Sequence, residues 1–178
     1  MTILGIDPSS TAIGLAVIDA DEGKFELVDS NALDLKGAKV LDEGAIPPRK
    51  RKMSPDERFV ELRGWVRWEI HDLREVVSPE YVVIERPQTR FPTPDMMETV
   101  GMVRSVLCDF DWMILPPMQA TTARKLIGVG GNASKQVAAE YVRKLLGDSA
   151  AGLDEHSTDA AAVAIAAWYQ LEQAKEAA

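Results

Sequence analysis

The stretch TILGIDPSSTAIGLAVID, residues 2–19, decides the fold. Its two apolar runs, residues 2–7 and 13–19, are typical of buried strands. Between them, Pro8-Ser9-Ser10-Thr11 has the chemistry of a turn. Residues 24–30 (KFELVDS) alternate like a third, half-exposed strand. Because the connections are too short for a crossover, we expect the three strands to form an antiparallel meander.

The rest of the chain predicts helices alternating with strands. Ser54-Pro55-Asp56-Glu57 combines a capping serine, an early proline and a glutamate three residues after the cap. Further strands are predicted at residues 80–85 and 111–115, and helices at residues 54–77, 93–108, 119–127 and 133–146 and from Ser157 onward. A strand after a long helix is typical of a parallel sheet. We therefore expect an α/β fold with the ribonuclease H-like layout, a mixed five-stranded sheet of three antiparallel and two parallel strands flanked by helices.

Composition favours one globular domain spanning residues 1–178, since hydrophobic residues make up 46% and charged residues 27% of the chain. Residues 37–53 have little periodicity, and we expect them to form a mobile loop. The single cysteine, Cys108, excludes an intrachain disulfide and is expected to be a small buried apolar residue. We expect no leader before the first strand, and no apolar stretch reaches the roughly 18 residues of a membrane span.

The net charge of −8 taken alone argues against nucleic acid as a partner, because phosphate binding is mainly electrostatic. A site for divalent cations adds acidic residues, however, and basic residues need only gather on one face. The basic residues do cluster along the sequence, as Arg49 to Lys52, Arg86 with Arg90, Arg124 with Lys125, and Lys135 with Arg143 and Lys144.

Three acidic residues stand where a strand ends or a helix begins: Asp7, Glu85 and Asp159. Ligands of open α/β sheets bind at the carboxyl ends of the strands, so Asp7 and Glu85 reach one edge if their strands are neighbours. His156 lies three residues before Asp159, which puts both on one helix face with Cβ atoms about 5–6 Å apart.

Three carboxylates and one imidazole in one cluster are unfavourable without cations. Oxygen-rich ligands suit Mg²⁺ or Mn²⁺, and the imidazole favours Mn²⁺. Two such ions activate water and neutralise a phosphodiester. Each residue also has a simpler interpretation: Asp7 caps a turn, Glu85 pairs with Arg86, His156 caps the helix, and Asp159 interacts with the helix dipole.

Four segments together resemble the RuvC-type Holliday junction resolvases. They are ILGIDPSSTAIGLAVID, YVVIERP, the stretch from Gly128 to Leu146, and HSTDAAAVAIAAW, in the family's order over nearly the whole chain. Ser9 stands where glycine is usual, and His156 stands where an acidic residue is more often seen. These departures are compatible with a phage-type member that cuts a wider range of branched DNA.

The resemblance implies that Asp7, Glu85, His156 and Asp159 are catalytic metal ligands. We hypothesise that Asp7 bridges two Mg²⁺ or Mn²⁺ ions, that Glu85 and Asp159 each hold one, and that His156 is a ligand or a proton donor. The resemblance further implies a cytoplasmic homodimer, in a bacterial or phage-infected cell, that nicks four-way junctions. The expected DNA contacts are Lys135, Arg124, Lys125, Arg86 and Arg90, with Phe91 as the aromatic wedge.

Two other functions remain open from the sequence. Residues 6–11 (IDPSST) also resemble the phosphate loop of actin-like and sugar-kinase ATPases, although those proteins need two such domains. The second alternative is a non-catalytic protein that binds branched DNA.

Overall fold

The computed structural model describes residues 1–42, 49–87 and 92–177. Its main sheet has the order β3-β2-β1-β6-β7. The strands are β1 (Thr2–Pro8), β2 (Ala12–Asp21), β3 (Lys24–Asp34), β6 (Tyr81–Arg86) and β7 (Met113–Ile114). β1, β2 and β3 pair antiparallel, whereas β6 is parallel to both β1 and β7. The predicted mixed sheet is confirmed, and β8 (Met118–Gln119) extends it by a short parallel pairing with β6.

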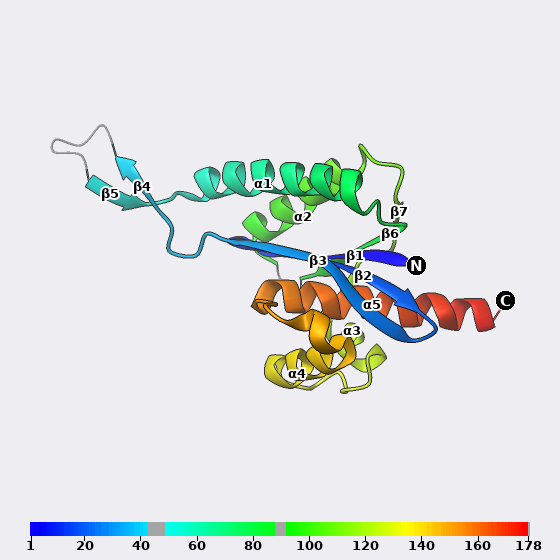
Figure 1. Cartoon of the computed structure of the whole chain (residues 1–178). Helices are drawn as coiled ribbons and strands as arrows, with labels where there is room; N and C mark the ends of the chain where they lie inside the picture. The colour runs from blue at the N-terminus through cyan, green and yellow to red at the C-terminus, as the bar shows by residue number, and fades with distance from the viewer. Residues whose placement is uncertain (43–48, 88–91, 178) are drawn as a thin grey trace.

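Helices cover both faces of this sheet (Figure 1). One face carries α1 (Pro55–Val76) and α2 (Pro94–Leu107), and the other carries α5 (Glu155–Glu176). α3 (Ala120–Leu126), α4 (Lys135–Leu146) and the short 3₁₀ helix Gly147–Ala150 pack on the α5 side. Side chains of a strand alternate between faces, so Leu4 and Ile6 pack on the α1 side and Ile3 packs on the α5 side. β1 is thus buried on both faces, as its continuous apolar run predicts.

The helix starts follow from capping residues. The Ser54 hydroxyl accepts a hydrogen bond from the backbone of Glu57, and the Glu57 carboxylate accepts one from the backbone of Ser54, as predicted for α1. α5 begins two residues before the predicted Ser157, because Asp154 is the capping residue and accepts from the Ser157 backbone at 2.9 Å.

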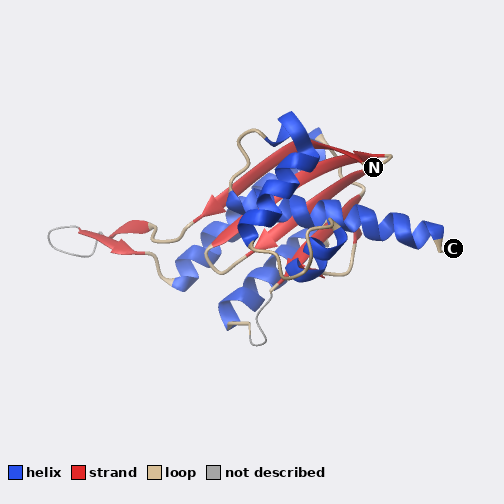
Figure 2. Ribbon diagram, turned by 90° about the horizontal axis from the view of Figure 1, so that it is seen from below, coloured by secondary structure: helices blue, strands red, loops and turns tan. Residues whose placement is uncertain are grey.

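The expectation of a loop at residues 37–53 was wrong. β4 (Lys39–Asp42) and β5 (Arg49–Lys52) form a separate two-stranded antiparallel hairpin, while residues 43–48 lie outside the described ranges. Figure 2 shows the hairpin extending away from the rest of the chain. Its strands pair with each other, and none of their residues whose burial is described belongs to the buried core, so they show no apolar alternation from which they could be predicted.

The expectation for Cys108 was also wrong, since its side chain is exposed. Cys108 follows Leu107, the last buried residue of α2, and therefore stands just beyond the core. Across the residues that the structure describes, no helix is long and apolar enough to span a membrane.

A buried carboxylate, Glu69 on α1, faces β3. It is only 5% exposed, and its Oε1 accepts a hydrogen bond from Asn31 Nδ2 at 2.7 Å. Burial, together with the charges of Asp29 and Asp72, raises the pKa of Glu69 above its usual value. The folded protein therefore favours the protonated form, and ionisation at higher pH costs stability.

We expect Glu69→Gln to raise the melting temperature, by about 2–4 °C at pH 8 if the gain is about 1 kcal/mol. Because the folded pKa lies above the unfolded one, the destabilisation is absent below the unfolded pKa, grows as pH rises above it and levels off above the folded pKa. The gain should therefore shrink toward pH 4, as thermal denaturation at both pH values would measure. Glu75→Gln, at an exposed position of the same helix, is the control. An equal gain at both pH values would contradict this origin.

Candidate active site

Asp7 and Glu85 lie side by side at one edge of the sheet. The parallel register pairs Ile6 of β1 with Ile84 of β6, so the next residues along the two strands are Asp7 and Glu85. Ile6 and Ile84 both pack on the α1 side. By alternation, the two carboxylates that follow face the α5 side. β1 and β6 are thus neighbours, which is the condition under which the sequence predicted that Asp7 and Glu85 meet at one edge.

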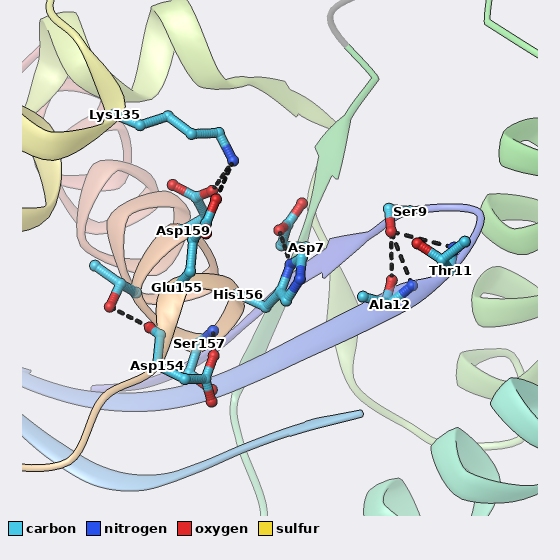
Figure 3. A network of polar contacts seen from close by, with 11 residues as sticks. Asp7, Ser9, Thr11, Ala12, Lys135, Asp154, Glu155, His156, Ser157 and Asp159 are labelled. Atoms are coloured by element: carbon cyan, nitrogen blue, oxygen red, sulfur yellow. Dashed lines mark hydrogen bonds and ion pairs between the residues drawn. The ribbon is translucent and has the colours of Figure 1, made fainter. Parts of the chain in front are cut away.

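His156 and Asp159 reach the same edge from the first turns of α5. Figure 3 shows His156 directed toward Asp7, and the His156 Nδ1 and Asp7 Oδ2 atoms are 3.4 Å apart. The capping role considered for His156 is excluded, because Asp154 caps the helix. The hydrogen bond to Asp7 and the Asp7 charge together outweigh burial and raise the pKa of His156. Asp7 therefore favours the protonated imidazole in this arrangement.

Gly14 of β2 lets α5 come this close. A Cβ atom at Gly14 would collide with the backbone carbonyl and the Cβ of His156. Gly5 of β1 has the equivalent role further along α5, where a Cβ would collide with the carbonyl oxygen of Ala160. The two glycines seat α5 directly on β1 and β2 and so bring its polar first turns to the carboxylates. This role could not be predicted from the sequence, because the contacts join residues far apart in the chain.

The carboxylates repel one another. Burial and the charges of Asp7 and Asp159 raise the pKa of Glu85 to about 9, although Lys135 and Arg124 act in the opposite direction. Burial also raises the pKa of Asp159, against the effect of its hydrogen bond from Lys135. Positive charge placed among these groups would stabilise their ionised forms.

Lys135 supplies some of that charge. Its Nζ donates to Asp159 Oδ2 at 2.7 Å and to Glu155 Oε1 at 3.3 Å (Figure 3). Burial lowers the pKa of Lys135. The bond to Asp159 and the charges of Asp159 and Asp7 together raise it by more than burial lowers it, so the net shift is upward. Lys135 opens α4, where a cation opposes the helix dipole. Its position is explained by the acidic cluster and not by the helix.

The donor set fits divalent cations by its chemistry. Three carboxylates and an imidazole lie at the same sheet edge on β1, β6 and α5, and burial together with the neighbouring carboxylates raises the pKa values of Glu85 and Asp159. Among the residues that the structure describes, no three acidic, histidine or cysteine side chains stand ready to hold one ion as placed. Asp159 is engaged by Lys135 and Asp7 by His156, so loading would require these side chains to turn.

The other predicted contact residues are distributed unequally. Arg124 lies close enough to influence Glu85 and Asp159, and its Nη1 donates to the Ala133 carbonyl at 3.0 Å. Arg86 and Lys125 are exposed. Arg90 and Phe91 lie outside the described residues, so their predicted roles stay predictions.

A groove beside Glu85 contains a residue that could not be singled out from the sequence. Arg104 of α2 lines it together with Glu85, Arg86 and Met97. Nothing in the local sequence marks Arg104, since it stands in the last turn of an ordinary amphipathic helix. Only the packing of α2 beside the end of β6 reveals it.

The chain is similar to known proteins over nearly its whole length. No protein-family model matches the chain. Crossover junction endodeoxyribonuclease RuvC of Parasynechococcus marenigrum is 29% identical over 177 residues, covering 96% of this chain and 99% of that protein. The protein of the same name from a Synechococcus species is 27% identical over 177 residues with the same coverage.

Solved structures extend the likeness to the fold. Thermus thermophilus RuvC superimposes with a TM-score of 0.73 at 20% identity, covering 98% of this chain and 97% of that one. The same protein in complex with a Holliday junction substrate gives a TM-score of 0.72, covering 97% and 96% of the two chains. The resemblance to the RuvC-type resolvases that the sequence predicts is thereby confirmed, in sequence over nearly the full chain and in its ribonuclease H-like fold.

Proposed function

We propose that this protein is a metal-dependent, structure-selective DNA endonuclease that nicks four-way junctions. The observation that carries this is the convergence of Asp7, Glu85, His156 and Asp159 on one sheet edge, with Lys135 beside them. Similarity to proteins named crossover junction endodeoxyribonuclease supports the substrate class. The overall charge of −8 does not oppose this function, because basic residues need only gather at the face that meets DNA, and Lys135 and Arg124 adjoin the cluster.

Asp7, Glu85 and Asp159 would hold Mg²⁺ or Mn²⁺, and His156 would complete the set. The bound cations would supply an activated water and neutralise charge on the phosphodiester. Lys135, released from Asp159, would be free to bond a phosphate oxygen of the substrate. Arg124 would add positive charge without leaving its bond to Ala133. The sheet edge provides the rigid base that keeps these groups in place.

The deciding experiment incubates a labelled four-way junction with the protein and either Mg²⁺ or Mn²⁺. Linear duplex, flap and fork substrates run beside it define the selectivity. We expect paired nicks in the junction and none when the metal is chelated. Tight binding without cleavage in either metal would favour the non-catalytic junction binder, and stabilisation against heat by ATP would favour the ATPase alternative.

His156 offers a test of the metal preference. We expect His156→Asp to keep Mg²⁺-supported cleavage and to lose some of the advantage of Mn²⁺, because an oxygen ligand replaces the imidazole. His156→Asn, a weaker ligand of similar size, should lose at least about 10-fold, the loss caused even by outer partners of a metal site. Initial rates in each metal measure both. If His156→Asp folds normally and cleaves in neither metal, the imidazole does more than bind a cation.

A second copy of the chain is the partner proposed for the outer face of α1. Val60 and Trp68 are 65% and 63% exposed, and Gly64 lies between them at the same helical spacing. A Cβ atom at Gly64 would meet nothing within 4 Å. Glycine inside a helix costs about 1 kcal/mol relative to alanine. Close approach of another helix would explain why glycine stands at this position. The resemblance to RuvC-type resolvases implies a homodimer, and this face suits one.

Trp68→Glu is expected to weaken the dimer by at least about 30-fold, since a central tryptophan of an interface contributes about 2 kcal/mol or more. Sedimentation over a range of concentrations would measure the change. Val137→Glu introduces the same charge at an exposed apolar position of α4 and should leave the dimer intact. Unchanged association of Trp68→Glu would remove this face from consideration.

A further inference from the structure

The β4–β5 hairpin carries a face of lysines that the active site does not use. The register places Lys39 opposite Lys52 and Leu41 opposite Lys50. Directly paired residues lie on the same face of a ladder, and so do residues two apart on one strand. Lys39, Lys50 and Lys52 therefore share one face. All three are exposed, and none forms an ion pair with any residue in the described ranges.

This arrangement opposes the hairpin's own stability. Like charges directly opposite each other destabilise an antiparallel pair. A two-stranded hairpin standing alone is marginally stable in water. Lys39 and Lys52 are such a pair, and no hairpin residue whose burial is described belongs to the buried core. An anion from outside the chain would turn the repulsion into a favourable interaction.

The base of the hairpin nevertheless bonds to the start of α1. The Arg51 guanidinium, on the opposite face from the lysines, bonds both carboxylate oxygens of Glu57 at 2.7 and 2.5 Å. Glu57 belongs to the cap of α1. The Met53 backbone donates to Ala38 at 3.0 Å, and Arg58 Nη1 donates to the Met53 carbonyl at 3.0 Å. These contacts join the base of the hairpin to the start of α1, and Arg51 is used internally while the lysines are exposed.

The hairpin leaves the molecule at the active-site edge. Its first strand follows β3, and the Leu35 backbone donates to the Thr11 carbonyl at 2.8 Å. Thr11 belongs to the turn that begins directly after Pro8, the residue next to Asp7. In Figure 1 the hairpin projects at the end of the molecule opposite both termini. DNA seated at Asp7 and running outward in this direction would pass beside the lysine face.

We infer that this face binds the phosphate backbone of one arm of the substrate DNA, outside the region of cleavage. The inference rests on the proposed nuclease function. Lysine acts as a point charge and suits phosphate contacts that carry no sequence preference. Neither strand, KVLD or RKRK, has an aromatic residue on which a base could stack. Lys50 stands two residues from Lys52, about 7 Å along the strand, which matches roughly two phosphates of one DNA strand at about 3.4 Å each along the helix axis.

The test compares three variants of the full-length protein with wild type. Lys39→Gln/Lys50→Gln/Lys52→Gln removes the charges, and the corresponding triple arginine variant keeps them. Lys24→Gln/Lys144→Gln/Lys175→Gln removes three charges elsewhere. Affinity for a four-way junction is measured in EDTA, which prevents cleavage, over a series of salt concentrations. Single-turnover cleavage is then measured at saturating protein in Mn²⁺.

We expect the hairpin glutamine variant to bind about 10- to 100-fold more weakly at about 50 mM salt, with the salt slope reduced by about 2.7 for three lost contacts. The arginine variant and the distant control should match wild type, and saturated cleavage should change less than twofold in all. The defect should vanish on junctions with arms trimmed to a few base pairs. Equal affinity and equal salt slope for the hairpin glutamine variant and the distant glutamine control would overturn the inference. An acidic protein partner would then be the remaining explanation for the lysine face. If wild type binds no branched DNA, the proposed function fails first, and this inference fails with it.

Discussion

Glu85→Gln is expected to reduce single-turnover cleavage of a four-way junction by about 10³-fold or more, the scale seen when a central member of a catalytic constellation is removed. Glutamine has nearly the same shape but lacks the charge that would hold a divalent cation. Glu85 lies beside Asp7 at the end of the neighbouring parallel strand, so no other carboxylate on that strand end replaces it. Gel-based cleavage assays in Mg²⁺ and Mn²⁺ measure the loss. Glu140→Gln, on the exposed surface of α4, is the control.

The same substitution should stabilise the metal-free protein. The pKa of Glu85 is raised to about 9 by burial and by Asp7 and Asp159. Because the folded pKa lies above the unfolded one, wild type loses stability as pH rises from the unfolded pKa toward 9. In EDTA the melting temperature of the variant should exceed that of wild type by a margin that grows from about pH 5 to about pH 8.5. Adding Mn²⁺ should reverse the order by stabilising only wild type. A cleaving Glu85→Gln protein would exclude this residue from the active site.

Gly14→Ala is expected to impair folding and chemistry together. The added methyl group meets backbone atoms of His156, which cannot turn aside as a flexible side chain can. α5 must then move away from β2. Overpacking of this kind costs typically about 1–3 kcal/mol and sometimes more, which at this chain length lowers the melting temperature by roughly 2–12 °C. A misplacement of about 1 Å at His156 and Asp159 can lower cleavage about 100-fold.

Thermal denaturation and single-turnover cleavage at a temperature where the variant remains folded separate the two effects. Gly101→Ala is the matched control, because a Cβ atom there meets nothing within 4 Å and alanine favours the helix by about 1 kcal/mol. It should melt at or above the wild-type temperature and cleave normally. Wild-type stability and cleavage in Gly14→Ala would show that α5 is not seated as closely as its contact with Gly14 indicates.

Much of the fold could be predicted because its signals are local. Continuous apolar runs marked β1 and β6, and the Ser54 to Glu57 cap marked the start of α1. The pairing of β1 with β6 brought Asp7 and Glu85 together as expected, since parallel neighbours end at one edge. The hairpin escaped prediction because β4 and β5 pair with each other in a separate sheet and carry few apolar residues. Cys108 was expected in the core because free cysteine is commonly buried. The expectation failed because residue type does not tell which side of a helix end a residue occupies.

The sequence by itself determined most of the order of strands and helices and which residues are candidates for the chemistry, because hydrophobic period, helix caps and turns depend on neighbouring residues. The tertiary structure decided which of those residues meet. His156 reaches Asp7 across 149 positions, and Lys135 bonds Asp159 across 24. Such contacts depend on how closely α5 packs on the sheet, which Gly5 and Gly14 set by lacking a side chain. No local pattern encodes the distance between α5 and the sheet. The charge interactions of the cluster could therefore be described only from the tertiary structure.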